Sequence, residues 1–319
     1  MKLPNRAPLF FAAVLLLALV QTASAQNQSL FSIAASPRVQ AIVDRAAKTA
    51  LEKFAVQKLQ TNELAVTLVD LRDPQKPERG SFRGGEQVYP ASVVKLFYLA
   101  AAHQWMEDGR LQDSEELRRA MRDMIVDSLN EATGYVVDCL TGTTSGPELP
   151  PVELEAWHAK RNAVNRWLAS LGYTNINVNR KPWCEGPYGR EMQSVKLHQP
   201  NHRNWLTTDA TARLLAEVAT GRAVTAERSK QMMELLQRRP FDPKAERQSL
   251  DYTAPALPEG TKLWSKAGWT SETRHDAAYV ELPNGAKFVL VVFTLNHANE
   301  KEIIPTVVRV VVEHLTAGR

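Results

Sequence analysis

The spacing of hydrophobic residues changes along the chain, and each change predicts a different kind of element. Apolar residues recur at helical spacing over residues 37–57, which predicts an amphipathic helix. A second terminal helix is expected over about 300–315. Segments rich in alternating or β-branched residues predict strands over 63–71, 80–87, 262–269, 275–282 and 287–295.

The middle of the chain is dominated by helical patterns. Helices are predicted over 92–107, 113–126, from near Asn130, and over 152–171, 207–220 and 224–237. Residues 173–203 break this pattern, because Asn, Pro, Gly and aromatic residues follow one another there without a period. A long irregular loop inside a compact enzyme is usually functional, so this segment is expected to contribute to a site.

Strands near both termini with helices between them indicate an α+β fold. We expect an antiparallel five-stranded sheet built from both termini, with flanking helices and an inserted all-helical domain. The α/β part would comprise about 36–90 and 258–319, and the helical part about 91–257. These parts belong to one domain over residues 26–319.

The first 25 residues have the features of a cleavable signal peptide. Lys2 and Arg6 give a basic start, residues 9–20 an apolar core, and Ala23-Ser24-Ala25 a small-residue cleavage site. The apolar core is too short to serve as a membrane anchor, and no cysteine follows the cleavage site for lipid attachment. We therefore expect a periplasmic or secreted protein without a membrane anchor after cleavage.

Charge and cysteine usage narrow the range of partners. The formal net charge of +4 falls to about +2 without Lys2 and Arg6, and no basic block indicates nucleic acid. The histidines do not show metal-ligand spacing, so neither a metal nor another cofactor is expected. Cys139 and Cys184 allow one disulfide in an oxidising compartment, or two separate thiols. The protein is expected to be a monomer.

The first candidate for chemistry lies in the sequence Tyr-Pro-Ala-Ser-Val-Val-Lys at 89–95. Ser92 and Lys95 lie three residues apart at a predicted helix start, so their side chains share one face. A partly desolvated lysine amine can take the proton of a serine hydroxyl, and the helix N-terminus can stabilise an oxyanion. Taken alone, the pair is more simply a helix cap followed by a surface lysine.

Two further polar motifs follow in the chain. Ser128-x-Asn130 lies between two predicted helices, and Lys266-x-Gly268 lies late in a predicted strand. Each motif is weak alone, since the first is usually a helix cap and the second a strand end. Their order after Ser92 and Lys95 is what makes the combination specific.

Together the three motifs resemble those of the penicillin-recognising serine acyl enzymes, the class A β-lactamases and the related penicillin-binding DD-peptidases. The resemblance covers nearly the whole mature chain. It includes the signal peptide, the order of elements, and a helix that begins at Thr207-Thr208-Asp209. The fold of this family agrees with the α+β fold predicted from the hydrophobic pattern.

The resemblance implies a role for each motif residue. Ser92 would be the nucleophile and Lys95 the group that deprotonates it, while Ser128 would pass a proton to the leaving nitrogen. Asn130 would hold the substrate and Lys95, and Lys266 would assist the proton transfer and attract a substrate carboxylate. An oxyanion site would be formed by the backbone N–H groups of Ser92 and of Trp269, which follows Gly268.

Two other parts of the expected site depend on the same resemblance. Ala267 stands where the family has a hydroxyl that binds the substrate carboxylate, so Thr270, Ser271 or Arg274 is expected to replace it. Hydrolysis of the acyl-enzyme requires a glutamate on the long loop. Glu185, which follows a tryptophan by two residues, is the first candidate for this base, and Glu191 the second.

Three functions are consistent with these residues. The one favoured is a serine hydrolase of the class A β-lactamase type, which opens the ring of penicillin-type antibiotics. The first alternative is a penicillin-binding D-Ala-D-Ala carboxypeptidase or transpeptidase that acts on peptidoglycan stem peptides. The second is a non-catalytic binder of β-lactams or muropeptides, which would not need all of Ser92, Lys95, Ser128, Asn130 and Lys266.

Overall fold

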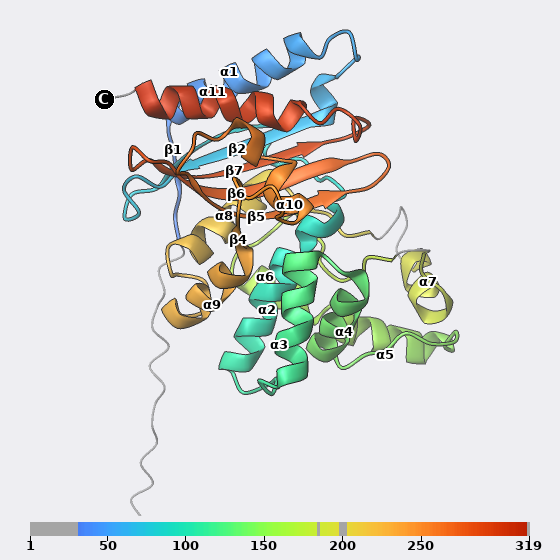
Figure 1. Ribbon diagram of the computed structural model, residues 1–319. Helices are drawn as coiled ribbons and strands as arrows, with labels where there is room; N and C mark the ends of the chain where they lie inside the picture. Colours follow the sequence, from blue (N-terminus) through green and yellow to red (C-terminus); the bar gives the residue numbers. More distant parts are fainter. Residues whose placement is uncertain (1–30, 184–185, 198–202, 318–319) are drawn as a thin grey trace, which may run out of the picture.

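The computed structural model describes residues 31–183, 186–197 and 203–317. The predicted signal peptide therefore lies outside the described residues, as do Cys184 and Glu185. Two layers of helices enclose one sheet, and a helical part extends from one side of it (Figure 1). This arrangement confirms the α+β prediction.

Seven strands in the described residues form one sheet in the order β1-β3-β2-β7-β6-β5-β4. Neighbouring strands are antiparallel except β1 and β3, which are parallel. The predicted count of five was wrong by two short edge strands, which are only two residues long and leave no period in the sequence. The strands are β1 (Ala34–Ala35), β2 (Leu64–Asp70), β3 (Glu78–Phe82), β4 (Gln237–Arg238), β5 (Lys262–Trp269), β6 (Arg274–Glu281) and β7 (Lys287–Thr294).

The centre of the sheet joins the two ends of the chain. β2 pairs with β7 from Leu64↔Thr294 to Asp70↔Phe288, and every residue of β2 is buried. The predicted hairpin between β6 and β7 is present, and its Gly285 has a positive φ of 86°. Both termini therefore contribute central strands, as the sequence predicted.

Helices α1 (Pro37–Lys53) and α11 (Ile303–Ala317) cover one face of the sheet (Figure 1). The apolar positions of α1 that suggested an amphipathic helix are buried there. On the other face α8 (Thr208–Ala219) packs against β2, β6 and β7. The remaining helices are α2 (Lys95–Glu107), α3 (Glu115–Arg122), α4 (Asn130–Thr141), α5 (Pro151–Arg161), α6 (Ala163–Ser170), α7 (Gly189–Lys196), α9 (Ala226–Leu236) and α10 (Arg247–Leu250).

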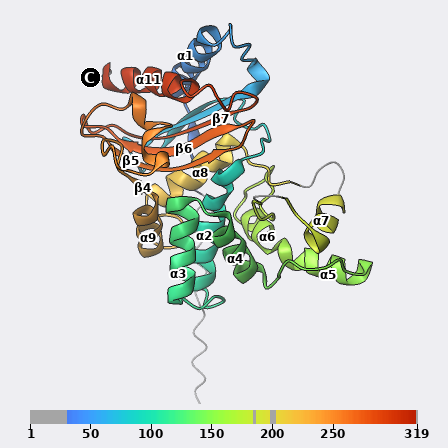
Figure 2. The same ribbon diagram turned by 45° about the vertical axis from the view of Figure 1, so that its right-hand side comes forward.

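Two helical predictions differ from the structure. The predicted helix 152–171 is divided into α5 and α6 at Asn162, whose side chain accepts hydrogen bonds from Asn165 and Asn179. The segment expected to be irregular contains α7, a short helix whose buried residues are Glu191 and Ser194. A helix that buries polar residues has no apolar period from which to predict it. Helices α5 and α7 lie at the edge of the helical part in two views (Figures 1 and 2).

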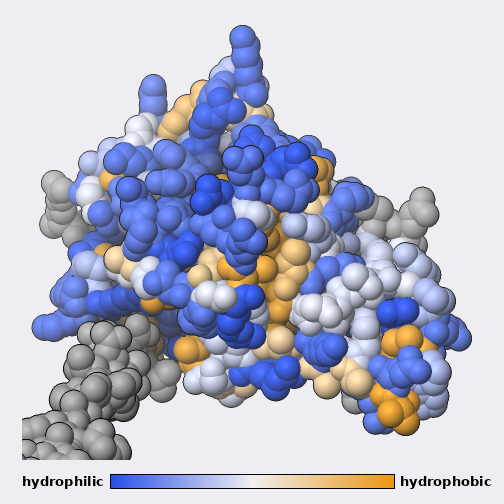
Figure 3. All heavy atoms as spheres, turned by 90° about the horizontal axis from the view of Figure 1, so that it is seen from below, coloured by the Kyte–Doolittle hydropathy of each residue, from blue (hydrophilic) through white to orange (hydrophobic). Residues whose placement is uncertain are grey.

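The surface on the helical side is mostly polar, with a band of apolar residues in its middle (Figure 3). Within the described residues, no helix combines the length and the hydrophobicity that a membrane span requires.

Candidate active site

Ser92 lies in a single 3₁₀ turn, Ala91–Val94, that leads directly into α2. The predicted helix start is thus confirmed, although its first turn is tighter than an α-helix. Ala91 has a φ of 46°, a left-handed conformation that costs a residue with a β carbon about 1–2 kcal/mol. Backbone strain of this kind is often found beside reactive groups, and here it places Ser92 half-buried at the turn.

Lys95 begins α2 one turn after Ser92, and its side chain is fully buried. Its Nζ donates to the backbone oxygen of Ser128 at 2.6 Å and to Oδ1 of Asn130 at 2.9 Å. It also lies 3.3 Å from Oγ of Ser128. The structure therefore joins the first and second motifs through one buried amine.

Ser128 ends a π-helical turn, Asp123–Asp127, and has a left-handed φ of 60°. Its Oγ accepts a hydrogen bond from Nζ of Lys266 at 2.9 Å. One hydroxyl thus lies between two buried lysines that come from opposite ends of the inserted helical part. All three motifs meet at Ser128, as the resemblance implied.

Burial is the main influence on the charge of Lys266. It lowers the pKa of the ammonium well below its usual value, and the positive charges of Lys95 and Arg238 lower the pKa further. The carboxylate of Asp276 acts in the opposite direction. Repulsion between two buried ammonium groups favours the loss of one proton from the lysine pair.

Gly268 allows β5 to approach the turn that carries Ser92. A β carbon at this position would lie 2.7 Å from Pro90 O, 2.9 Å from Ser92 N and 3.0 Å from Val93 N. These are backbone atoms, which cannot move aside as a flexible side chain can. The third motif therefore needs a glycine because a strand and a helix start touch there.

The backbone amide of Trp269 is available at the same place. The amide of Thr270 donates to Thr273 O at 3.0 Å, which makes these two residues a hydrogen-bonded pair at the start of the β5–β6 ladder. Hydrogen-bonded and non-hydrogen-bonded pairs alternate along an antiparallel ladder. Trp269 and Arg274 thus form a non-hydrogen-bonded pair, and the Trp269 N–H points away from β6. This direction is consistent with its expected role as an oxyanion donor.

We predict that Gly268→Ala slows acylation by about 10²–10³-fold, the range associated with loss of one oxyanion donor. The added methyl group must push β5 away from Pro90 and Ser92. Rates of adduct formation with a fluorescent penicillin would measure this effect. Gly285→Ala, in the distant β6–β7 turn, is the control for a glycine substitution of similar size. A Gly268→Ala protein that acylates at the parental rate would contradict the close approach described here.

His275, on β6, contacts the backbone just before the turn that carries Ser92. Its Nε2 lies 2.9 Å from Tyr89 O, and its Nδ1 accepts a hydrogen bond from Thr294 N at 3.0 Å. These partners require a neutral ring with the proton on Nε2. Burial lowers the pKa of His275 to about 4, so the ring stays neutral at physiological pH. Nothing in the sequence around His275 indicates this structural role.

Two of the residues expected to bind a substrate carboxylate, Thr270 and Arg274, lie in different environments. Thr270 is exposed, and its Oγ1 accepts from Glu272 N and Thr273 N, both at 3.1 Å, within a turn. Arg274 is buried, donates to Asp251 O at 2.8 Å and lies over the ring of Tyr252. Among the described residues, none of the contacts shown for Arg274 joins it to Ser92, Ser128 or Lys266. Its role in carboxylate binding stays a prediction that these contacts do not support.

Glu191 belongs to a buried ionic cluster in the long loop. Its Oε1 accepts from Arg161 Nη2 at 2.8 Å and from Ser145 Oγ at 2.9 Å, and lies 3.8 Å from Lys181 Nζ. Lys181 also donates to Asp138 at 2.6 Å. These contacts fasten α7 to the helical part, which gives Glu191 a structural task. Glu185, the first candidate for the deacylation base, lies outside the described residues.

Cys139 carries a free thiol on α4. Cys184, the other cysteine of the possible disulfide, lies outside the described residues. Within the part of the chain that the structure describes, no group of three or more His, Cys, Asp or Glu side chains could hold a metal ion.

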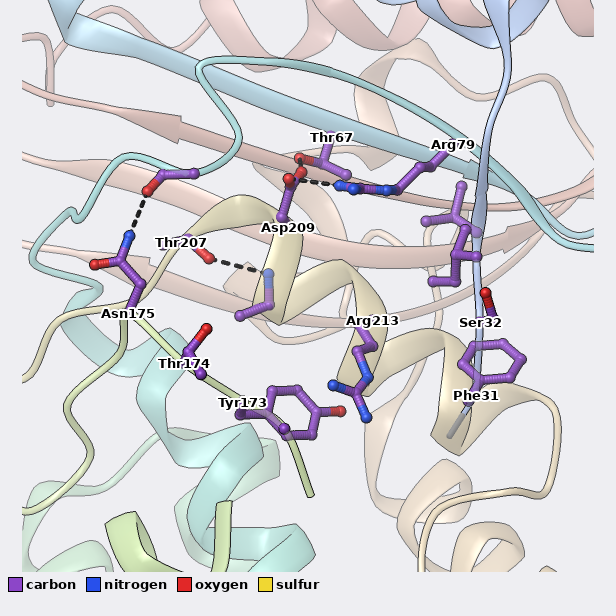
Figure 4. Close-up of a pocket in the computed structure, with 15 residues that line it drawn as sticks. Phe31, Ser32, Thr67, Arg79, Tyr173, Thr174, Asn175, Thr207, Asp209 and Arg213 are labelled. Carbon is purple, nitrogen blue, oxygen red and sulfur yellow. Dashed lines mark hydrogen bonds and ion pairs between the residues drawn. The ribbon is translucent and has the colours of Figure 1, made fainter. Parts of the chain in front are cut away.

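A cavity of about 470 Å³ lies beside the start of α8 (Figure 4). Asp209 accepts there from Thr67 Oγ1 at 2.7 Å and from Arg79 Nη1 at 2.6 Å. The hydroxyl of Thr207 accepts from Ala210 N at 3.0 Å and caps α8. These polar groups attach α8 to β2 and β3, which explains the Thr-Thr-Asp sequence at this helix start. None of the three motifs lines the cavity.

Three residues around the third motif could not be identified from the sequence. Gln248 and Arg238 contact the β5 backbone, while the half-exposed Arg247 has its guanidinium over the ring of Trp269, 5.6 Å from its centroid. These residues lie on β4 and α10, which are only two and four residues long. Neither element leaves a sequence pattern that would have identified them.

The fold, and the meeting of Lys95 and Lys266 at Ser128, support a serine hydrolase of the β-lactamase and penicillin-binding type. The chain belongs to the beta-lactamase enzyme family, whose model matches residues 46–315. No curated protein matches the sequence.

Solved structures with the same fold include β-lactamases and a penicillin-binding protein. A β-lactamase from Sphaerobacter thermophilus is 21% identical, with a TM-score of 0.61, and covers 85% of this chain and 97% of its own. A β-lactamase from Xanthomonas campestris is 17% identical, with a TM-score of 0.63, and the match covers 86% of this chain and 98% of that protein. A PBP-A variant, solved as an acyl-enzyme complex with penicillin G, is 17% identical, with a TM-score of 0.62. The match covers 86% of this chain and 97% of that protein.

Proposed function

We propose that the protein hydrolyses the ring of penicillin-type β-lactams through an acyl-enzyme on Ser92. The observation that carries this proposal is the position of Ser128 Oγ, 2.9 Å from Lys266 Nζ and 3.3 Å from Lys95 Nζ. A hydroxyl held between two lysines, one of them three residues after Ser92 at the same helix start, would provide a path for one proton from nucleophile to leaving group.

The proposed acylation has two steps. Oγ of Ser92 attacks the lactam carbonyl carbon while its proton moves to the neutral amine of Lys95. The oxyanion that forms accepts hydrogen bonds from the N–H groups of Ser92 and Trp269. The carbon–nitrogen bond then breaks, and the proton of the Ser128 hydroxyl goes to the leaving nitrogen. The ammonium of Lys95 returns a proton to Ser128, which restores both groups.

Deacylation needs a base that activates water, and we propose Glu185 for this role. Water would attack the ester carbonyl, give its proton to Glu185 and release Ser92. Glu191 is the weaker candidate, because its carboxylate already pairs with Arg161 and accepts from Ser145. The assignment of Glu185 rests on its place in the sequence.

The decisive experiment follows the mature protein with a chromogenic cephalosporin by absorbance and by intact-mass spectrometry. Continuous colour with a transient adduct on Ser92 would support the proposal. One burst of colour followed by a long-lived adduct would favour the penicillin-binding peptidase instead. Absence of any adduct would overturn the acyl-enzyme proposal and favour the non-catalytic binder.

We predict that Glu185→Gln traps the acyl-enzyme. Loss of the base leaves acylation intact but slows deacylation by about 10²–10⁴-fold, the usual contribution of general base catalysis. The measurement is the lifetime of the adduct by mass spectrometry after a single addition of substrate. Glu259→Gln, far along the chain from the loop, is the control. Unchanged turnover in Glu185→Gln would remove this residue from the proposed role.

The peptidase is the second candidate function, and one observation favours it. PBP-A matches this chain over the same share of its length as the β-lactamases and forms an acyl-enzyme with penicillin G. Peptidoglycan stem peptides ending in D-Ala-D-Ala would then be the natural substrate. Export to the periplasm or medium is a further proposal, which rests on the sequence of the first 25 residues. Action as a monomer is also proposed.

A further inference from the structure

Lys266 has a complete set of hydrogen-bond acceptors. Its Nζ donates to Gln248 Oε1 at 2.6 Å, to Ala267 O at 2.8 Å and to Ser128 Oγ at 2.9 Å. An ammonium group has three N–H bonds, so each of them has one acceptor. The shortest of the three contacts comes from Gln248.

Gln248 is itself fixed by four hydrogen bonds. Its Oε1 accepts from Lys266 Nζ and from Ala267 N at 3.1 Å. Its Nε2 donates to Val126 O at 2.7 Å and to Ile125 O at 3.2 Å. A side-chain amide has two donors and two acceptor positions, and all four are used. This fixes which end of the amide faces Lys266.

The same contacts connect two parts of the site that are far apart in the sequence. Ile125 and Val126 belong to the π-helical turn that ends at Ser128, and the last carbonyls of a helix have no partner within it. Gln248 supplies donors to these carbonyls, and Arg238 Nη2 adds another to Ile125 O at 3.1 Å. One side chain therefore sets both the Lys266 ammonium and the backbone that precedes Ser128.

The orientation of the Ser128 hydroxyl follows from this arrangement. Its oxygen accepts from Lys266 Nζ and lies 3.3 Å from Lys95 Nζ. Once Lys95 has taken the proton of Ser92 it is an ammonium with a third N–H for this oxygen, and the two lysines then occupy both lone pairs. Its own proton then points away from both lysines. That is the direction a proton must have to reach a leaving nitrogen.

We propose that Gln248 is a positioning residue, which holds Lys266 so that the Ser128 proton is directed at the leaving nitrogen during acylation. The inference rests on the proposed function and adds to it a residue that acts through Lys266. Nothing in the family motifs points to this glutamine.

The charged groups that face Lys266 are Lys95 from α2, Arg238 from β4 and Asp276 from β6. Burial and the two cations favour the neutral amine, while Asp276 and the acceptor oxygens favour the ammonium. Acylation that needs the ammonium of Lys266 is lost as the pH rises through its pKa. Removal of the Gln248 oxygen should lower this pKa, and a carboxylate in its place should raise it.

The test measures the second-order rate constant of acylation by a chromogenic cephalosporin between about pH 5 and pH 10. This interval covers roughly the pKa values that lysines have in proteins. In Gln248→Leu we expect acylation about 10–100-fold slower at neutral pH, as for a misplaced reacting group, with the alkaline limb moved to lower pH. In Gln248→Glu we expect the alkaline limb to move to higher pH.

Gln40→Leu is the matched control. Gln40 also uses both ends of its amide, to Ser81 O at 2.9 Å and from Ser81 N at 3.0 Å, but lies on α1 across the sheet. This variant should acylate at the parental rate at every pH. Thermal unfolding of each variant shows whether it is folded. If Gln248→Leu does not fold, the test is whether the alkaline decline of the acylation rate moves to higher pH in Gln248→Glu.

Two outcomes would overturn the inference alone. One is acylation by Gln248→Leu at the parental rate, and the other is a slower rate with the alkaline limb of both variants unmoved, which marks a purely structural role. A parent protein that forms no adduct with any β-lactam would overturn the proposed function, and this inference with it.

Discussion

Ser92→Ala is expected to form no covalent adduct with any β-lactam and to lose turnover by on the order of 10⁴–10⁶-fold, as when other serine hydrolases lose their nucleophile. The reason is chemical, because an alanine methyl group cannot attack a carbonyl carbon. The substitution should not disturb the fold, since Ser92 is only half-buried and the neighbouring Val93 and Val94 carry the packing. Intact-mass spectrometry after incubation with penicillin measures the result directly.

Ser170→Ala, at the end of α6, is the control for the loss of a serine hydroxyl away from the site. It should label at the parental rate. A Ser92→Ala protein that still gains the mass of penicillin would show that another residue is the nucleophile. Peptide mapping of that adduct would then identify the residue.

Lys95→Arg is expected to reduce acylation by about 10²–10⁴-fold, the usual contribution of a general base. Arginine carries several N–H donors that can serve the acceptors Ser128 O and Asn130 Oδ1. A guanidinium cannot lose its proton in a protein, however, and cannot accept one from Ser92. The variant therefore separates proton transfer from the structural contacts of Lys95.

Lys95→Met is the companion variant, because it fills much of the same volume without any donor. It should lose acylation to the same extent and also lose about 1–3 kcal/mol of stability, since buried acceptors would have no partner. Single-turnover rates and thermal unfolding measure the two effects. Parental acylation in Lys95→Arg would assign the base role to another group.

The parts of the fold that could be predicted from the sequence are those with a repeated pattern. The five long strands and the terminal helices were found because their apolar residues recur with a period of two or of about 3.6. Residues 152–171 were predicted as one helix because Asn162 does not interrupt the pattern, although its side chain bonds to Asn165 and Asn179. Contacts of this kind arise only after distant segments have met.

The site divides in the same way. Ser92, Lys95, Ser128, Asn130 and Lys266 could be predicted because each lies in a short motif whose residue types carry chemistry. Gln248, Arg238 and His275 act through hydrogen bonds to the backbone of other segments, and a backbone contact leaves no mark on the partner's sequence. Arg274 is a different case: its place beside the third motif suggested a substrate contact, its guanidinium lies over Tyr252, and its role stays a prediction.

The contact between Gly268 and the Ser92 turn has a consequence for how activity arises during folding. The two segments are separated by the whole helical part, and β2 must also pair with β7, from Leu64 to Thr294. Contacts between residues so far apart in sequence form late, because a large loop must close first. A partly folded chain would therefore contain the Ser92 turn without the strand that packs against it. If the proposed function is correct, covalent labelling by penicillin would occur only in the completely folded protein. During refolding, the time at which labelling begins would then mark when the C-terminal strands complete the sheet.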